Sequence, residues 1–322
     1  MVKLINPIND NPLERTEKGL VDKMGAVFPL VRGAYRFVEA SNYTDNFGYQ
    51  WNKFQKTQID RALTQHQQST ERFFAQTGWK NKNLQNKNVL EVGSGAGRFS
   101  QVILSNTKAN LYSIDYSSAV EANFKNNGPH ERLNLFQASI YGMPFEPESF
   151  DKVFCFGVLQ HTPDFKQSIR QLCRMVKPGG ELVIDFYPIR GWYTKIHAKY
   201  LFRPLTKQLK HAALLSLIEK NADGLIAAYK FLHRVKLGVL SRFIPICDIK
   251  NTLPEGLSAV ELKEWVILDT FDMFSPAYDH PQRIKKVAKW INEEGLRVSF
   301  ADFVEFGGNN KAAVVRALKL IK

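Results

Sequence analysis

Short apolar runs alternate with amphipathic segments between residues 85 and 189, and this alternation is the clearest pattern in the chain. Buried parallel strands are short and continuously apolar, whereas the helices that cover them carry apolar residues three or four positions apart. The pattern therefore predicts repeated βαβ units around a parallel sheet. The five predicted strands are 89–92, 111–115, 133–138, 152–156 and 182–186.

Amphipathic helices are predicted between these strands. Residues with helical spacing share one face, which would pack on the sheet. The helix before the fifth strand is predicted to end at Pro178, Gly179 and Gly180, which turn the chain back into the sheet. The predicted apolar faces consist of Phe99, Val102 and Ile103, then Val120 and Phe124, then Phe165, Ile169, Leu172 and Val176.

Residues 190–280 break the alternation and predict an inserted, basic helical cap. Leu225, Tyr229 and Leu232 have the i, i+4, i+7 spacing of one helical face. Residues 281–322 are then predicted to complete the sheet with one helix, capped by Gly295, and a hairpin. The expected hairpin strands are 296–304 and 312–318, and the turn chemistry lies at 307–310.

Residues 1–84, before the predicted sheet, are expected to form a separate amino-terminal region that consists of an arm and helices. The first twenty residues are rich in Asn and Pro and lack periodicity, so they are predicted to be an arm without a fold, either loose or merely lying on the surface. From Val21 to Gly78 the pattern predicts helices, with an aromatic cluster at 47–51 and Gly78 as the terminating residue.

Composition limits the possible classes of protein. The chain has 322 residues, of which 44% are hydrophobic, enough for a packed core. No apolar run approaches the roughly 18 to 20 residues of a membrane-spanning helix. Cys155, Cys173 and Cys247 lie far apart, which argues against a disulfide framework or a zinc site. No signal or transit peptide is readable. We therefore expect a cytoplasmic protein without a bound metal.

The chain is strongly basic, with a formal net charge of +13. Residues 190–250 contain twelve Lys or Arg residues and three acids, so this stretch of 61 residues alone supplies +9 of this charge. Such an excess favours phosphate-rich partners, namely nucleic acid, anionic lipid or a nucleotide-linked substrate. A solvated helix face is the simpler interpretation of the same charges.

A glycine-rich turn follows the first predicted strand, in the sequence Glu-Val-Gly-Ser-Gly-Ala-Gly-Arg at 91–98. Glycine permits positive φ and close approach of a ligand to the backbone, and the next helix offers unpaired N–H groups. The third glycine comes one position too early for a dinucleotide fingerprint, and Arg98 occupies a position that requires a small residue. No Gly-Lys-Ser/Thr follows, which excludes a P-loop.

Asp115 ends the second predicted strand, next to the glycine turn in a parallel sheet. A carboxylate at this position can accept hydrogen bonds from both hydroxyls of a ribose. The turn, the acid and the downstream strands together predict a ligand that contains a nucleoside. An ordinary tight turn with a surface Asp is the alternative.

These motifs resemble those of the class I S-adenosylmethionine-dependent methyltransferases, over residues 85–190 and the final hairpin. The resemblance implies an α/β fold with a doubly wound, Rossmann-like sheet of seven strands, of which only the last is antiparallel. Amino-terminal helices and an inserted helical cap would flank this sheet. The matching segments are 91–97, Asp115, 139–145, 150–161 and 172–180.

The resemblance also implies the cofactor S-adenosylmethionine and a set of residues to bind it. Glu91 would help to hold the methionine ammonium group, Asp115 the ribose and Ile140 the adenine. Many relatives have Asp where this chain has Ser139. The complete predicted set is Glu91, Gly93, Ser94, Gly95, Gly97, Asp115, Tyr116, Ser139, Ile140, Phe156 and Gly157.

His161 is the candidate general base, because it follows the fourth strand and an unperturbed imidazole titrates near pH 6.5. A hydrogen bond to neighbouring backbone is the alternative role. The candidate substrate contacts are Tyr49, Trp51, Tyr187, Asp269, Asp272 and Tyr278, each of which could instead serve packing or helix capping.

We therefore expect methyl transfer to a small or medium acceptor, through an oxygen of a sugar, a lipid-linked molecule or another metabolite. Two alternatives stay open. An RNA or other nucleic-acid methyltransferase is favoured by the charge but lacks an Asn/Asp-Pro-Pro-aromatic motif and a Pro-Cys nucleophile. A non-catalytic scaffold could retain the fold and bind anionic membrane or RNA through its basic cap.

Overall fold

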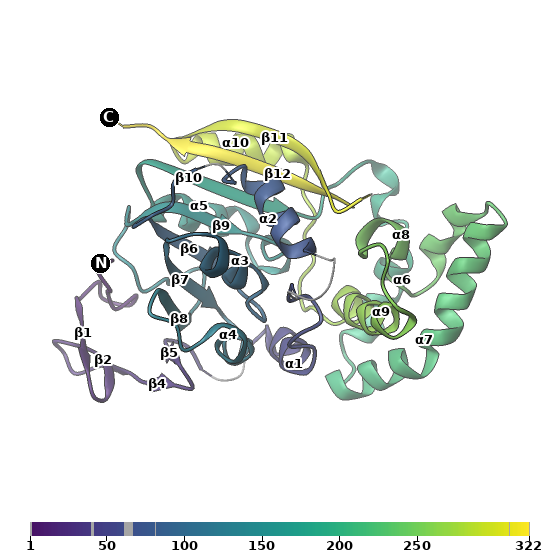
Figure 1. Ribbon diagram of the computed structural model, residues 1–322, viewed down its shortest axis with the longest axis horizontal. Coiled ribbons are helices and arrows are strands. Elements are labelled where there is room, and N and C mark those ends of the chain that lie inside the picture. The colour runs from purple at the N-terminus through teal and green to yellow at the C-terminus, as the bar shows by residue number, and fades with distance from the viewer. Residues whose placement is uncertain (1, 40–41, 61–66, 81, 309, 322) are drawn as a thin grey trace.

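A large twisted sheet forms the centre of the protein (Figure 1). The structure is a computed structural model that describes residues 2–39, 42–60, 67–80, 82–308 and 310–321. Within these residues the sheet has nine strands in the order β11-β12-β10-β9-β6-β7-β8-β5-β4. Their bounds are β4 Leu30–Val31, β5 Ala34–Arg36, β6 Asn88–Val92, β7 Asn110–Asp115, β8 Leu133–Gln137, β9 Phe150–Cys155, β10 Val176–Phe186, β11 Leu296–Phe306 and β12 Asn310–Lys319.

Seven of these strands are the predicted ones, from β11 to β8 in the sheet order, which confirms the fold class. β12 pairs antiparallel with both β10 and β11, so it alone runs against the other six. From β6 the chain proceeds to β7 and β8 on one side and later to β9 and β10 on the other. The strand order therefore reverses between β6 and β9, where α/β sheets form their ligand crevices.

Two boundaries in this part of the sheet differ from the predictions. β10 begins at Val176, earlier than predicted. The segment that contains Gly179, with φ +78°, belongs to this strand, and the pairing of β10 with β9 shifts in register between Val176 and Glu181. The final hairpin is longer than predicted. Its predicted turn includes residue 309, which lies outside the described residues.

The prediction of a loose amino-terminal arm is wrong. β1 (Leu13–Thr16), β2 (Gly19–Asp22) and β3 (Val27–Phe28) form a small antiparallel sheet. Leu20 is fully buried within the main hydrophobic core. The Asp22 carboxylate accepts a hydrogen bond of 2.7 Å from the Asn6 side chain, and such bonds hold its pKa at about 2. These contacts join residues distant in sequence, so periodicity does not reveal them.

The predicted helical region that begins at Val21 is also wrong in its first half. β5 adds to β8 in parallel and β4 pairs with β5, which extends the predicted seven-stranded sheet to nine strands. Helices begin only with α1 (Asp45–Lys53) and α2 (Gln68–Thr77). Gly78 ends α2 with φ +68°, as predicted.

Helices cover both faces of the sheet, as a doubly wound fold requires. α5 (Phe165–Met175) and α10 (Ile284–Glu293) pack on one face, through residues such as Leu172 and Val287. α2 and α3 (Arg98–Asn106) pack on the other through Phe73, Phe99 and Ile103. α4 (Val120–Asn127) packs beside α3 and β8. The short helix η1 (Leu159–His161) follows β9.

Residues 192–274 are mainly helical, as predicted. They form η2 (Trp192–Lys195), α6 (Ala198–Thr206), α7 (His211–Arg234), η3 (Gly238–Phe243), α8 (Ile249–Thr252) and α9 (Ala259–Phe274). Leu214, Leu215 and Ile218 of α7 pack against Leu268 and Phe271 of α9. Figure 1 shows these helices at one end of the sheet. Among the described residues, no helix is long and apolar enough to cross a bilayer.

The burial of Leu20 makes the amino-terminal sheet testable. Leu20→Ala removes a fully buried side chain and should lower the free energy of unfolding by about 2 to 5 kcal/mol. Ile8→Ala, at a position 88% exposed, should change it by less than about 0.5 kcal/mol. Urea denaturation followed by circular dichroism measures both. Equal stability of the two variants would contradict the packing of this sheet on the core.

Candidate active site

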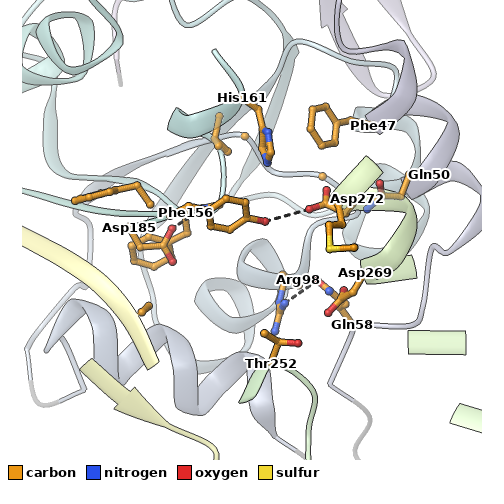
Figure 2. Close-up of a pocket in the computed structure, with 18 of the residues that line it drawn as sticks. Phe47, Gln50, Gln58, Arg98, Phe156, His161, Asp185, Thr252, Asp269 and Asp272 are labelled. Atoms are coloured by element: carbon orange, nitrogen blue, oxygen red, sulfur yellow. Dashed lines mark hydrogen bonds between the residues drawn. The ribbon is translucent and has the colours of Figure 1, made fainter. Parts of the chain in front are cut away.

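A cavity of about 550 Å³ lies at the carboxyl ends of the strands, where the strand order reverses. Its walls come from α1, from the segments that follow β6, β7, β9 and β10, and from the helical cap. Figure 2 shows His161 and Phe47 at one end of the view and Arg98 and Gln58 at the other. The predicted residues that line it are Trp51, Gly93, Ser94, Gly95, Asp115, Tyr116, Ile140, Phe156, Gly157, His161, Tyr187, Asp269 and Asp272.

The glycine turn between β6 and α3 needs its glycines for two different reasons. Gly93 has φ +83°, and a Cβ there would lie 2.1 Å from a methyl carbon of Val158. Gly97 has φ +84°, and its Cβ would lie 2.2 Å from Asn123 Oδ1, so it serves packing on α4 and does not line the cavity. Gly95 lines the cavity, where its Cβ would lie 3.1 Å from the indole nitrogen of Trp51. Gly93 and Gly97 therefore allow close packing of the turn against Val158 and Asn123, whereas Gly95 leaves the backbone accessible from the cavity.

Asp115 is held at the cavity wall by its own neighbours. Its Oδ2 accepts a 2.8 Å hydrogen bond from the Gly95 N–H, while Oδ1 accepts bonds from the Ser117 N–H (2.8 Å) and hydroxyl (2.6 Å). Burial raises the pKa of this carboxyl above its ordinary value, and the three bonds oppose that effect. The carboxylate thus connects β7 to the glycine turn with a defined orientation.

Two residues that line this cavity contain buried polar atoms without partners in the described part of the chain. The Ser94 hydroxyl and Gln50 Oε1 are both buried and have no hydrogen-bond partner among the described residues, although both residues line the cavity. Gly157 has φ +72°, and a Cβ there would meet no atom within 4 Å. Buried polar groups are normally satisfied. The arrangement therefore leaves open space and free polar atoms for a ligand.

His161 is buried at the cavity wall, between Phe47 and Tyr187, with ring centroids 5.1 and 5.5 Å away. Its Nδ1 lies 3.0 Å from the Tyr278 carbonyl oxygen, and Nε2 has no partner among the described residues. A carbonyl oxygen only accepts, so Nδ1 carries the proton and Nε2 the lone pair. Burial lowers the pKa of the imidazole, which favours this neutral form. The predicted backbone bond and the candidate base are therefore compatible.

Four aspartates besides Asp115 line the cavity: Asp185, Asp248, Asp269 and Asp272. Sequence analysis missed Asp248 and also Asp185 on β10. Its Oδ2 accepts a 2.7 Å hydrogen bond from Arg72 and its Oδ1 one from the Gly157 N–H. Burial, and next the Asp272 charge, raise the pKa of Asp269 to about 7. Asp272 accepts a 3.1 Å hydrogen bond from the Tyr187 hydroxyl. An acid inside the apolar run of strand 182–186 was the signal for Asp185, because a buried carboxylate needs partners.

Arg98 was interpreted only as an argument against a dinucleotide, yet it lines the cavity. Its Nε donates to the Ser69 hydroxyl (3.1 Å) and its Nη1 to Gln58 Oε1 (2.6 Å), as Figure 2 shows for the latter. Nη2 is buried and has no partner among the described residues. Arg98 and Arg72 together bring positive charge to the part of the cavity wall near α2.

Five predicted residues do not line the cavity: Glu91, Gly97, Ser139, Tyr49 and Tyr278. Glu91 Oε2 instead accepts hydrogen bonds from the Ser113 hydroxyl, at 2.7 Å, and from Ser100 beneath the glycine turn. Burial raises the pKa of this carboxyl to about 7. The structure therefore does not bring Glu91 to the surface where a methionine ammonium group would lie. Its predicted contact with that group stays a prediction.

The other residues outside the cavity have packing or backbone contacts. The Ser139 hydroxyl accepts a 3.1 Å hydrogen bond from the Tyr141 N–H. Tyr49 packs at 6.0 Å from the ring of Phe271 in the core of the cap. Tyr278 contributes its carbonyl group to His161 rather than its ring to the cavity.

Comparison with known proteins places this site in a methyltransferase domain. Residues 90–184 match a family described as "Methyltransferase domain". The tRNA U34 carboxymethyltransferase of Nautilia profundicola is 32% identical over 111 residues, which are 34% of this chain and 37% of that protein. The ubiquinone biosynthesis O-methyltransferase of Coxiella burnetii is 30% identical over 129 residues, 38% and 55% of the two chains. The matches thus span little more than half of these relatives at most.

A solved structure supports the same fold over most of the chain. The cyclase SpnF aligns over 87% of this chain and 94% of its own, with a TM-score of 0.51 and 11% sequence identity. Such a likeness concerns the fold alone. The fold is that of the class I S-adenosylmethionine-dependent methyltransferases, as the sequence motifs predicted. Within it, this chain carries the methyltransferase domain at residues 90–184.

The position of Asp115 predicts its effect on cofactor binding. Asp115→Ala removes the carboxylate that would bind the ribose hydroxyls, and hydrogen bonds to charged groups contribute about 1.5 to 3 kcal/mol each. We expect S-adenosylmethionine binding in calorimetry to weaken at least about 100-fold. Asp302→Ala, at an exposed position on β11, is the matched control. Unchanged affinity in a folded Asp115→Ala variant would remove this residue from the site.

Proposed function

We propose that this protein is an S-adenosylmethionine-dependent methyltransferase that methylates an oxygen atom of a small or medium acceptor. The observation that carries the proposal is the unpartnered, buried Nε2 of His161, which shares one cavity with the glycine turn and Asp115. This arrangement supports a base beside a nucleoside site. Oxygen acceptors benefit from such a base because a hydroxyl must lose its proton.

The residues of the cavity suit S-adenosylmethionine. Asp115 would hold the ribose, the unpartnered Ser94 hydroxyl and Gly95 would lie along the ligand, and Ile140 and Phe156 would supply apolar walls. Tyr116 lines the same side of the cavity. When bound, this cofactor supplies an electrophilic methyl group on a positively charged sulfur. Ser139 and Glu91 would influence the cofactor only through neighbouring residues, because neither lines the cavity.

The chain itself has three tasks in this reaction. His161 Nε2 accepts the proton of the acceptor hydroxyl, while the Tyr278 carbonyl keeps the imidazole in the required tautomer. Phe47, Phe156 and Tyr187 exclude water from the reacting atoms. The cavity wall aligns the acceptor oxygen for an in-line displacement. Among the described residues, no group of three or more His, Cys, Asp or Glu side chains is arranged to hold a metal.

The acceptor class rests on weaker support than the reaction class. The cavity continues under the cap, where Tyr187, Asp269 and Asp272 are available to polar groups of a sugar, a lipid-linked molecule or another metabolite. Trp51 closes the opposite wall over Gly95. One relative is named as an O-methyltransferase, which supports an oxygen acceptor. A tRNA acceptor is the second candidate, favoured by the name of another relative and by the net charge.

An assay with methyl-labelled S-adenosylmethionine tests the acceptor class. The purified protein is incubated separately with fractionated metabolites, lipids and RNA, and label transfer is counted in each. We expect label in the metabolite or lipid fraction. Treatments that hydrolyse RNA should not release this label. Label in RNA alone would establish the second candidate. Cofactor binding without transfer to any fraction would favour a non-catalytic scaffold.

His161→Gln should lower kcat by about 100- to 10,000-fold while S-adenosylmethionine affinity stays within about twofold, because the base is lost and the cofactor site is not. His280→Gln, at an exposed histidine outside the cavity, should retain activity. Full activity of a folded His161→Gln variant would remove the base assignment.

The same residue predicts a dependence on pH. Burial lowers the imidazole pKa, so wild-type kcat/KM should fall only as pH drops below about 6.5, where Nε2 becomes protonated. Asp272, Asp279 and Lys199 also act on this pKa, the two carboxylates raising it and the lysine lowering it. Because the folded state favours the neutral ring, its contribution to the free energy of unfolding is also lost as pH falls through this range. The His161→Gln profile should lack this acidic limb.

A further inference from the structure

The outer side of the cap exposes an unusual number of large apolar side chains. More than half of the exposed large hydrophobic residues that the structure describes lie between residues 192 and 243. Trp192 is 84% exposed, Leu205 70% and Val239 71%. We call the following residues of η2, α6 and η3 the cap patch: Trp192, Tyr193, Ile196, Leu201, Leu205, Val239, Leu240 and Phe243.

Specific contacts join η2 and η3 within the cap patch. Arg242 of η3 donates a 2.8 Å hydrogen bond to the Tyr193 carbonyl oxygen, and its guanidinium carbon lies 5.6 Å from the centroid of the Tyr193 ring. Residues about fifty positions apart in sequence are thus adjacent. η2 is followed along the chain by α6. η3 packs against the end of α7, where a Cβ on Gly238 would lie 2.7 Å from the His233 ring.

α6 has one bound face and one free face. Arg203 donates to the carbonyl oxygens of Met273 (3.3 Å) and Pro276 (2.8 Å), which fixes one side of α6 on α9. Leu201 and Leu205, one turn apart, remain exposed on another side. Thr194 and His197, in the same stretch of chain, line the catalytic cavity. The segment from η2 to α6 therefore contributes some residues to the cavity wall and exposes other, apolar residues to solvent.

The charges around the cap patch are positive and unneutralised. The two acids of α7 are already engaged, Glu219 with Lys53 at 2.9 Å and Asp223 with Lys263 at 2.7 Å. Residues 190–250 carry a net charge of +9. The exposed cations of this segment that have no ion-pair partner among the described residues are Arg190, Lys195, Lys207, Lys210, Lys220, Lys230, Arg234, Lys236 and Lys250.

We propose that the cap patch docks on the surface of a lipid bilayer that contains anionic phospholipids. Exposed Trp and aliphatic side chains beside lysines are the composition of surfaces that lie in a bilayer interface, with the apolar groups in the lipid and the cations at the headgroups. RNA would require cations and stacking aromatic rings but would not cover Leu205 or Val239. A second copy of this surface would be repelled by the same charge. This docking goes beyond methyl transfer and does not depend on it.

Vesicle sedimentation with the full chain tests the proposal. Vesicles of phosphatidylcholine with about one quarter phosphatidylglycerol should bind at least about tenfold more protein than vesicles of phosphatidylcholine alone. The combined variant Trp192→Ser, Leu205→Ser and Val239→Ser should reduce binding to the anionic vesicles about tenfold. Val260→Ser, at a position of α9 that is 78% exposed and outside the cap patch, should bind as the wild type does.

A second variant separates charge from apolar contact and covers the case in which the triple variant does not fold. Lys207→Glu with Lys210→Glu should bind anionic vesicles about tenfold less and lose most of the dependence on salt. Equal vesicle binding by this variant and the wild type, no binding by the wild type, or preferential capture of RNA would overturn the proposal. The assay contains no methyl donor, so calorimetry with S-adenosylmethionine reports separately on the proposed function.

Discussion

The hydrogen bond from the Gly95 N–H to the Asp115 carboxylate is the constraint on which the site depends. It joins the turn after β6 to the end of β7, the two places where a nucleoside would contact the protein. Gly95 has φ +52°, and close neighbours hold the rest of the turn, namely Val158 against Gly93 and the α4 residue Asn123 against Gly97. A carboxylate that the fold orients in advance loses little entropy when a ligand binds.

The end of the cavity that contains His161 is assembled differently, because its groups come from distant parts of the chain. His161 follows β9, the carbonyl group that fixes its tautomer belongs to Tyr278 after the cap, and Phe47 comes from α1. Burial keeps the imidazole neutral and also raises the pKa of Asp269 to about 7. Low-dielectric surroundings thus favour uncharged acid and base groups in one enclosed space, which suits proton transfer. The cap that encloses this space also carries the exposed apolar patch on its other side.

The strands from β6 to β10, the terminal hairpin and the residues Gly93, Gly95 and Asp115 could be predicted because their signals are local. Apolar runs, turn glycines and helical spacing arise within a few residues of one another. The amino-terminal strands were mispredicted for the opposite reason. Leu20 becomes strand core only through distant residues, and β5 exists because β8 offers a free edge. Asp185 and Arg98 were overlooked because a polar residue gains its role from partners such as Arg72 and Gln58.

The sequence by itself therefore determined the class of fold, the positions of its central strands along the chain, and the glycine turn and Asp115 that the structure brings together at the cavity. Only the tertiary structure decided that Glu91 lies beneath the turn instead of in the cavity, that Nε2 of His161 is the free nitrogen, and that η2 and η3 form one surface. The physical reason is the distance along the sequence over which each kind of interaction acts. Backbone geometry and hydrophobic periodicity act between near neighbours, whereas burial, hydrogen-bond partners and shared surfaces exist only after remote segments have packed together.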